Sequence, residues 1–233
     1  MKILISLFAL FLSANLLAQT EQVRPIGEFS GISSASGINV QITQGEVNKV
    51  IVKSSTGDNI DRIITEVDKN GVLKIYMEYN KTKGWKNTKG EILSAFVTYQ
   101  SINKISASSG AILKTTNVLK TTSLSVDASS GAVLNASVQA GDAKIEVSSG
   151  SNATLTGTAS NVKIEVSSGS VFTGINLETQ QCKATASSGA NISIAVAKSL
   201  TAVASSGGTI KYKGNPGVDK LSTSSGGEVK KFN

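Results

Sequence analysis

The chain has 233 residues, with 23 Lys and Arg against 16 Asp and Glu, a formal net charge of +7, no His and one Cys. The lack of His excludes Ser–His–Asp triads, Cys–His dyads, HExxH zinc sites and imidazole general bases, and a single Cys excludes internal disulfides and thiolate zinc clusters. Aromatic residues make up only 5%, which predicts a narrow aliphatic core without room for rings.

Residues 1–18 have the pattern of a secretory signal peptide. Lys2 supplies a short positive region, residues 3–17 are mostly apolar, and Ala18 suits the position before a cleavage site. This apolar run is shorter than the roughly 20 residues of a membrane-spanning helix, and no later run reaches that length. We therefore expect export to the periplasm, outer surface or extracellular space, without a transmembrane segment in the mature chain.

Residues 19–100 form the first predicted part of the mature chain and are rich in β-strand signals. Alternating or continuous apolar runs predict the strands 37–43, 49–53, 63–67, 72–76 and 92–99. Asn70 and Gly71 predict a hairpin between two of them, and residues 58–64 predict a short helical turn. We expect this β-rich region to cap one end of the fold that follows.

A loop-like segment at residues 81–90 interrupts these strands. It holds the only Trp, Trp85, together with Lys81, Lys83, Lys86 and Lys89. The indole could stack on a sugar ring while the lysines hold an acidic glycan. The same residues also fit a solvated hairpin loop with Trp85 packed on the sheet, and the sequence leaves both interpretations open.

Residues 101–233 contain a tripeptide repeat. Ser-Ser-Gly occurs seven times, with Gly at 110, 131, 150, 169, 189, 207 and 226, so that the spacings are 21, 19, 19, 20, 18 and 19 residues. A related Ser-Ala-Ser-Gly ends at Gly37. A near-constant period of this length is typical of solenoids. It predicts an all-β fold, a parallel β-solenoid of about 19-residue coils, and argues against a β-sandwich.

The residues around each tripeptide alternate with period two. Taking every second residue gives an inner set such as Ile105, Ala107, Ser109, Ala111 and Leu113. This pattern predicts strands whose inner face includes the second Ser of each tripeptide, stacked in a buried ladder. The Gly falls on the outer set, where we expect it to provide backbone freedom at a bend.

An outer column of acidic residues follows from the same register. Asp127, Glu146 and Glu165 occupy equivalent positions in consecutive coils, with Lys144 and Lys163 two residues before the two glutamates. Paired carboxylates could serve glycoside hydrolysis, and three of them could hold Ca²⁺. The interpretation we favour is a surface charge ladder relieved by the neighbouring lysines, so no catalytic residue, metal site or cofactor is assigned.

The order of these features resembles a known family. The segment 29–46 (FSGISSASGINVQITQGE), the Asn-Gly hairpin, a strand ending at Tyr99 and the Ser-Ser-Gly coils are similar to DUF2807, the auto-transporter adhesin head GIN domain family of Bacteroidetes. Gly37, Ile38 and Asn39 match its name-giving tripeptide. The resemblance implies a β-helical protein of the cell surface or periplasm, and it carries no catalytic residues.

The leading hypothesis is an exported, non-enzymatic β-solenoid that binds a glycan or another envelope component. A carbohydrate-active enzyme using the stacked acids and a purely structural envelope protein are the alternatives. Nucleic acid is not an expected partner of an exported protein. The flat outer column formed by the first Ser and the Gly of each tripeptide leaves self-association open.

The signal peptide makes the first testable prediction. The mature protein recovered from the cell envelope or medium should begin at Gln19 or Thr20, because cleavage follows Ala18 or Gln19. N-terminal mass spectrometry measures this directly. An intact Met1 on the exported protein would contradict it.

Overall fold

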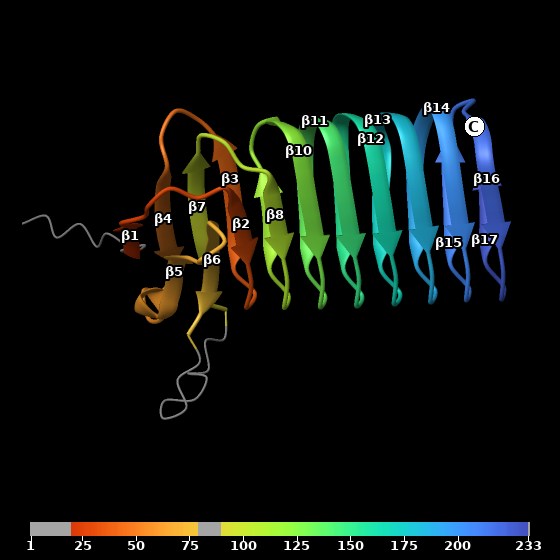
Figure 1. Ribbon diagram of the computed structural model, residues 1–233. Helices are drawn as coiled ribbons and strands as arrows, with labels where there is room; N and C mark the ends of the chain where they lie inside the picture. Colours follow the sequence, from red (N-terminus) through yellow and green to blue (C-terminus); the bar gives the residue numbers. More distant parts are fainter. Residues whose placement is uncertain (1–19, 79–89, 233) are drawn as a thin grey trace, which may run out of the picture.

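The computed structural model describes residues 20–78 and 90–232 as a stack of β-coils (Figure 1). A single short 3₁₀ turn, η1 (Ile60–Arg62), accompanies the strands of these residues. The strands are β1 (Thr20–Arg24), β2 (Gly31–Ser34), β3 (Asn39–Gln44), β4 (Lys49–Ser54), β5 (Ile63–Val67), β6 (Val72–Met77), β7 (Leu93–Tyr99), β8 (Lys104–Ala107), β9 (Ile112–Thr115), β10 (Leu119–Ala128), β11 (Val133–Val147), β12 (Asn152–Val166), β13 (Val171–Ala186), β14 (Asn191–Ala204), β15 (Thr209–Lys213), β16 (Gly217–Thr223) and β17 (Glu228–Lys231).

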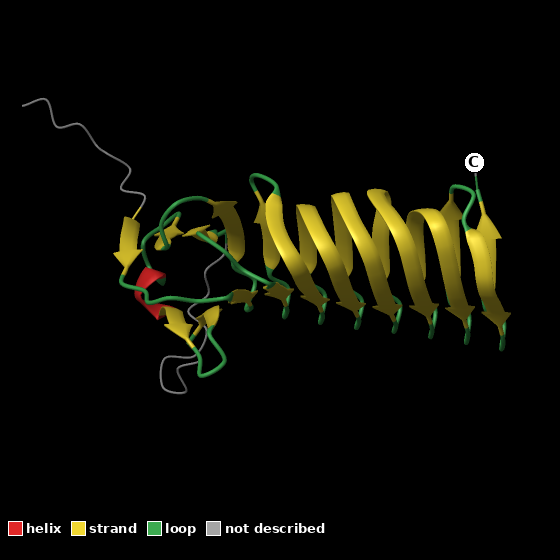
Figure 2. Ribbon diagram, turned by 45° about the horizontal axis from the view of Figure 1, so that its top comes forward, coloured by secondary structure: helices red, strands yellow, loops and turns green. Residues whose placement is uncertain are grey.

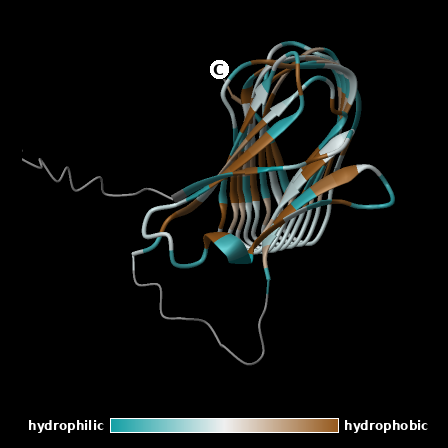
Figure 3. Ribbon diagram, turned by 90° about the vertical axis from the view of Figure 1, so that its left-hand side faces the viewer, coloured by the Kyte–Doolittle hydropathy of each residue, from teal (hydrophilic) through white to brown (hydrophobic). Residues whose placement is uncertain are grey.

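The coils stack in parallel, which confirms the predicted β-solenoid. Strand β11 pairs with β12, β12 with β13 and β13 with β14, each in parallel register over most of its length. Each of these long strands bends once, so one strand supplies two walls of a coil. Viewed along the stack, the coils superpose as a flattened loop, and hydrophobic and hydrophilic residues alternate along its strands (Figure 3).

The Ser-Ser-Gly tripeptide forms the sharp corner of each coil. In the turn at Ser149 and Gly150, the two residues have φ of 56° and 70°. The N–H of Ser151 closes this turn on the carbonyl oxygen of Ser148 at 3.3 Å. Two successive residues with positive φ are the signature of a type I′ turn, which Gly adopts without steric cost. The predicted role of the Gly is therefore confirmed.

The turns are also bonded to one another. The N–H of Gly150 donates to the carbonyl oxygen of Ser168 in the next turn at 3.1 Å, and the N–H of Gly131 donates to that of Ser149 at 3.0 Å. The same bond joins Gly37 to Ser109, so the Ser-Ala-Ser-Gly turn between β2 and β3 is the first member of the column.

The predicted inner ladder of second serines is wrong. Ser109 and its equivalents lie in the turn with positive φ, and Ser109 is exposed. Alternation breaks here because two left-handed residues reverse the chain direction without continuing the strand. In two coils the buried serine instead follows the Gly directly, as Ser151 and Ser170, and the hydroxyl of Ser151 donates to the carbonyl oxygens of Ala128 and Ser148.

The slips in repeat length lie away from this corner. Register shifts occur between Thr154 and Thr156, between Gly174 and Glu178, and between Thr179 and Gln181. The residues on both sides of each Ser-Ser-Gly turn pair with those of the next coil at the same sequence spacing as the turns. Variation in coil length is therefore absorbed by bulges along the wall that follows each turn and at the far bend, where a strand can add or remove a residue.

The core is aliphatic, but the prediction that it has no room for rings is wrong. Phe172 lies inside the stack with 0% exposure. Space for its ring comes from Gly174 on the same face of β13, where an added Cβ would lie 2.8 Å from the ring. A missing side chain two residues away thus accommodates the aromatic ring.

The N-terminal part continues the stack and then changes strand direction (Figure 2). Strands β2 and β3 pair in parallel with β8 and β9, whereas β4 and β5 run antiparallel to β7 and β6. The predicted hairpin at Gly71 and the helical turn at η1 are both present. Strand β1 begins at Thr20, so loss of residues 1–18 leaves every described strand intact.

The turn column yields a stability prediction. Gly150→Ala should lower the free energy of unfolding by about 1–2 kcal/mol, because an L-residue is strained at positive φ. An added Cβ would contact nothing within 4 Å, so the loss reports the backbone alone. Ser149→Asn should raise stability, since Asn tolerates this conformation better. Denaturant unfolding measures both changes.

The control is Asn152→Ala, an exposed site on β12, which should change stability by less than about 0.5 kcal/mol. Equal effects of Gly150→Ala and Asn152→Ala would contradict the proposed strain.

Candidate functional site

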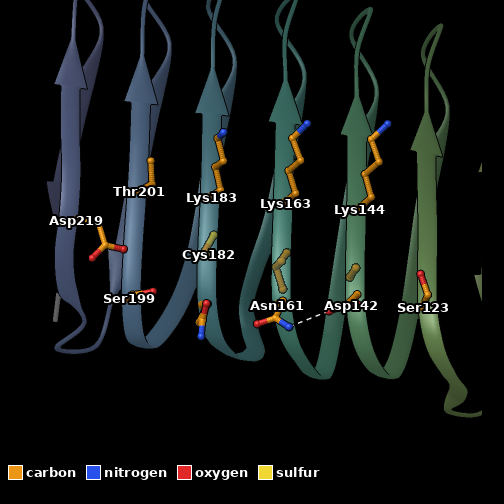
Figure 4. Close-up of a pocket in the computed structure, with 13 residues that line it drawn as sticks. Ser123, Asp142, Lys144, Asn161, Lys163, Cys182, Lys183, Ser199, Thr201 and Asp219 are labelled. Carbon is orange, nitrogen blue, oxygen red and sulfur yellow. Dashed lines mark hydrogen bonds between the residues drawn. The ribbon is translucent and has the colours of Figure 1, made fainter.

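A groove of about 440 Å³ crosses the coils on the wall that leads into each Ser-Ser-Gly turn (Figure 4). We call it the coil groove. One edge is a polar column at the far bend of each coil, and the other is a lysine column two residues later. The polar column consists of Ser123, Asp142, Asn161, Gln181 and Ser199, and the lysine column consists of Lys144, Lys163 and Lys183.

The polar edge is partly hydrogen-bonded along the stack. The Asn161 side-chain amide donates to the Asp142 carboxylate at 2.8 Å. Ser199 continues the edge, and Asp219 closes the C-terminal end of the groove. This edge presents hydroxyl, amide and carboxylate groups at the spacing of stacked strands, about 4.8 Å.

Sequence reasoning did not find the groove, because it followed the alternation only around each Ser-Ser-Gly tripeptide and not through the far bend. The alternation changes phase at the bend: Ala140 and Ala143 are both buried, whereas Asp142 between them is exposed. Two outward residues in succession, repeating with the turn spacing, are the sequence signal for this polar edge.

The acidic ladder lies beside the groove on the same wall. Asp127, Glu146 and Glu165 are register partners on β10, β11 and β12. Lys144 forms an ion pair with Glu146 at 2.5 Å, and Lys163 forms one with Glu165 at 2.7 Å. Asp127 lies 3.3 Å from Lys104 of the preceding coil. Each carboxylate of the ladder therefore has a cation beside it.

These ion pairs bear on whether the acidic ladder could serve glycoside hydrolysis or hold a metal ion. The hydrogen bond from Lys144 lowers the pKa of Glu146, with the lysine charge acting in the same direction. A glycosidase acid needs the opposite shift, towards neutrality. Within residues 20–78 and 90–232, no group of three His, Cys, Asp or Glu side chains is arranged to hold a metal ion.

Lys183 differs from the other two lysines of the groove. Its register partner is Lys163, but the residue two positions later is Thr185 where the neighbouring coils have Glu146 and Glu165. No carboxylate of the described part of the chain pairs with Lys183 within ion-pair distance. The centre of the groove thus carries an ammonium group without an internal counter-ion.

Cys182 forms part of the groove floor, between Gln181 and Lys183. The residue is only 5% exposed, and burial raises the pKa of its thiol to about 12. A thiol in this state is neither a nucleophile nor a ready partner for a disulfide at neutral pH.

The glycan contacts predicted from the sequence are Trp85, Lys81, Lys83, Lys86 and Lys89, and all lie outside the described residues. The predicted signal peptide lies outside them as well. In the described residues, no helix has the length and hydropathy needed to cross a membrane.

Residues 28–216 match the model of the family described as "Putative auto-transporter adhesin, head GIN domain" (DUF2807). The chain belongs to this family. The match begins just before β2 and runs to the bend before β16, so it spans the whole stack of turns except the last. No curated protein sequence matches the chain.

Solved structures share the fold at low sequence identity. A protein from Bacteroides fragilis, named a putative adhesin, has a TM-score of 0.77 at 20% identity, covering 91% of this chain and 96% of its own. A putative adhesin from Parabacteroides merdae has a TM-score of 0.71 at 16% identity, covering 92% and 96%. A protein from Parabacteroides distasonis named a putative lipid binding protein has the same score and identity, covering 92% and 97%.

The buried thiol gives a prediction for this site. Cys182 should resist iodoacetamide in the folded protein at pH 8 and react fully after denaturation, because the thiolate fraction and access are both small. Mass spectrometry of the alkylated protein measures the difference. Rapid labelling of the folded protein would show that the groove floor is open to solvent.

Proposed function

We propose that this protein is an exported, non-enzymatic adhesin-type module that binds a linear glycan along the coil groove. The observation that carries the proposal is the pair of parallel polar and basic edges on successive coils, with Lys183 unpaired by any described carboxylate. A ligand that contacts several coils must itself repeat along its length, as a polysaccharide does. Family membership supports the adhesin-type role.

The edges of the groove suit a polyhydroxylated ligand. Asn161 and Gln181 offer amide donors and acceptors, and Ser199 and Thr201 offer hydroxyl groups. Sugar hydroxyls both donate and accept, so they can satisfy such groups in place of water. A lipid chain would leave these polar edges without partners, and only small buried side chains such as Ala143 and Val162 form the floor.

The charges of the groove narrow the ligand further. Lys183 lies at the centre, whereas Asp142 and Asp219 lie two coils away on either side. At about 4.8 Å per coil, each acid is roughly 10 Å along the groove from the lysine. This arrangement favours a glycan with widely spaced carboxylates over a dense polyanion, whose charges would also meet the aspartates.

An enzymatic role has less support. The glutamates of the acidic ladder beside the groove, Glu146 and Glu165, form ion pairs with Lys144 and Lys163, and the pKa of Glu146 is lowered. The groove is also open along its length, so it does not exclude water from a bound chain. We therefore expect no release of reducing ends from any glycan that binds.

The test is a glycan array followed by calorimetry with the best acidic oligosaccharide. Lys183→Gln should weaken binding about tenfold, because it removes a charge-assisted hydrogen bond. The matched control is Lys211→Gln, an exposed lysine of β15 on the other wall, which should leave the affinity unchanged.

Equal loss with both variants would indicate non-specific charge attraction and would contradict the groove site. Binding to phospholipid vesicles but to no glycan would overturn the ligand class.

A further inference from the structure

The two ends of the solenoid are not equivalent. At the N-terminal end, β1, β4 and β5 add antiparallel strands to the stack. At the C-terminal end, β16 pairs with β14 and β17 pairs with β15, and no other strand of the described residues covers them. The last coil therefore presents two open strand edges, one on each wall.

The core also extends to this open end. Leu221 of β16 stacks on Ala202, which is 0% exposed, yet Leu221 itself is 47% exposed. Val218 is the register partner of Leu200 and is 46% exposed. Half-exposed apolar residues beside unpaired backbone groups are the features by which one strand edge recruits another.

The backbone hydrogen bonds to β14 and β15 determine which N–H and C=O groups of the last coil are unpaired. The N–H of Glu228 and the N–H of Phe232 donate back to β15, so the backbone groups of Val229 and Lys231 point to the open edge. On the other wall the N–H of Ser224 donates back to β14. The backbone N–H and C=O groups of Leu221 and Thr223 therefore point to the open edge in the same way.

We infer that a second copy of this chain covers this end, tail to tail, with β16 and β17 each pairing antiparallel to their own copies. A two-fold axis through Val229 on one wall and Ser222 on the other satisfies both edges. These residues lie equally far from the Ser225–Gly226 turn and so face each other across the coil. Val229 then exchanges backbone hydrogen bonds with Val229 of the second copy, and Leu221 exchanges them with Thr223 of the second copy.

The charges at this end match that register. Glu228 lies directly opposite Lys230 of the second copy, and the symmetry repeats the pair. Lys220 lies opposite an uncharged residue, Ser224.

Edge lysines and a bulge can also protect an edge against pairing. Here the register shift lies between Val218 and Lys220, and residues 220–223 remain in regular register with β14.

The first test is a charge exchange monitored by light scattering after size exclusion, on the protein without its predicted signal peptide. The wild-type protein should be a dimer. Glu228→Lys and Lys230→Glu should each weaken dimerisation about tenfold or more, because each places like charges opposite one another twice. The double variant should restore the dimer.

The melting temperatures of the single variants separate association from folding. The Glu228–Lys230 pair within one strand is exposed, so its loss should leave the monomer folded. A wild-type protein that stays monomeric at about 100 µM, or equal dimerisation of all variants, would overturn the inference.

The second test uses cysteine cross-linking in a Cys182→Ala background. Val229→Cys should form a disulfide-linked dimer, since directly opposite residues of an antiparallel pair lie within disulfide range. Val23→Cys, a 62% exposed site on β1 at the other end, should remain monomeric. A mixed disulfide between the two variants would instead show head-to-tail assembly and would overturn the tail-to-tail arrangement.

Discussion

The bond between successive Ser–Gly turns is the constraint on which the rest of the structure depends. Each turn uses two left-handed residues, and the Gly N–H donates to the Ser carbonyl of the next turn. This bond aligns one corner of every coil with its neighbours. Strands on both sides of the corner inherit that alignment, and coil lengths vary only where the register shifts, at the far bend and the bulges.

The coil groove is a consequence of this alignment. Lys144, Lys163 and Lys183 form a column because they keep a constant distance in sequence from their turns. The polar edge beside them repeats for the same reason. A surface built in this way places polar side chains at equivalent positions of each coil, which suits a ligand that also repeats. Thr185, in place of the glutamate of the two preceding coils, leaves Lys183 without a carboxylate partner among the described residues and makes the centre of the groove distinct.

Much of the fold could be predicted from the sequence because the repeat and the two-residue alternation are both local signals. The strands and the parallel stack follow from them, and the hairpin at Gly71 follows from the Asn-Gly dipeptide. The orientation of Ser109 could not be predicted, because alternation assumes a continuous strand and says nothing of a left-handed Ser. Phe172 was missed because its space depends on Gly174, and residues 174 to 178 lie where the register shifts.

The candidate site was harder to predict than the fold. The sequence placed Asp127, Glu146 and Glu165 in one column, but it did not show that a groove lies beside them. That groove arises from the bend at Asp142 and Asn161, where two outward residues follow each other. The exposed apolar edge at Leu221 likewise depends on where the stack stops, which no local pattern encodes.

The most direct test of the coil groove as the binding surface is an NMR titration of the backbone amides with the acidic oligosaccharide that binds best in calorimetry. We predict shifts concentrated at Asp142, Asn161, Gln181, Lys183 and Ser199, with little change on the opposite wall around Lys211. Shifts concentrated on that opposite wall, with the groove unaffected, would contradict the assignment of the coil groove as the binding surface.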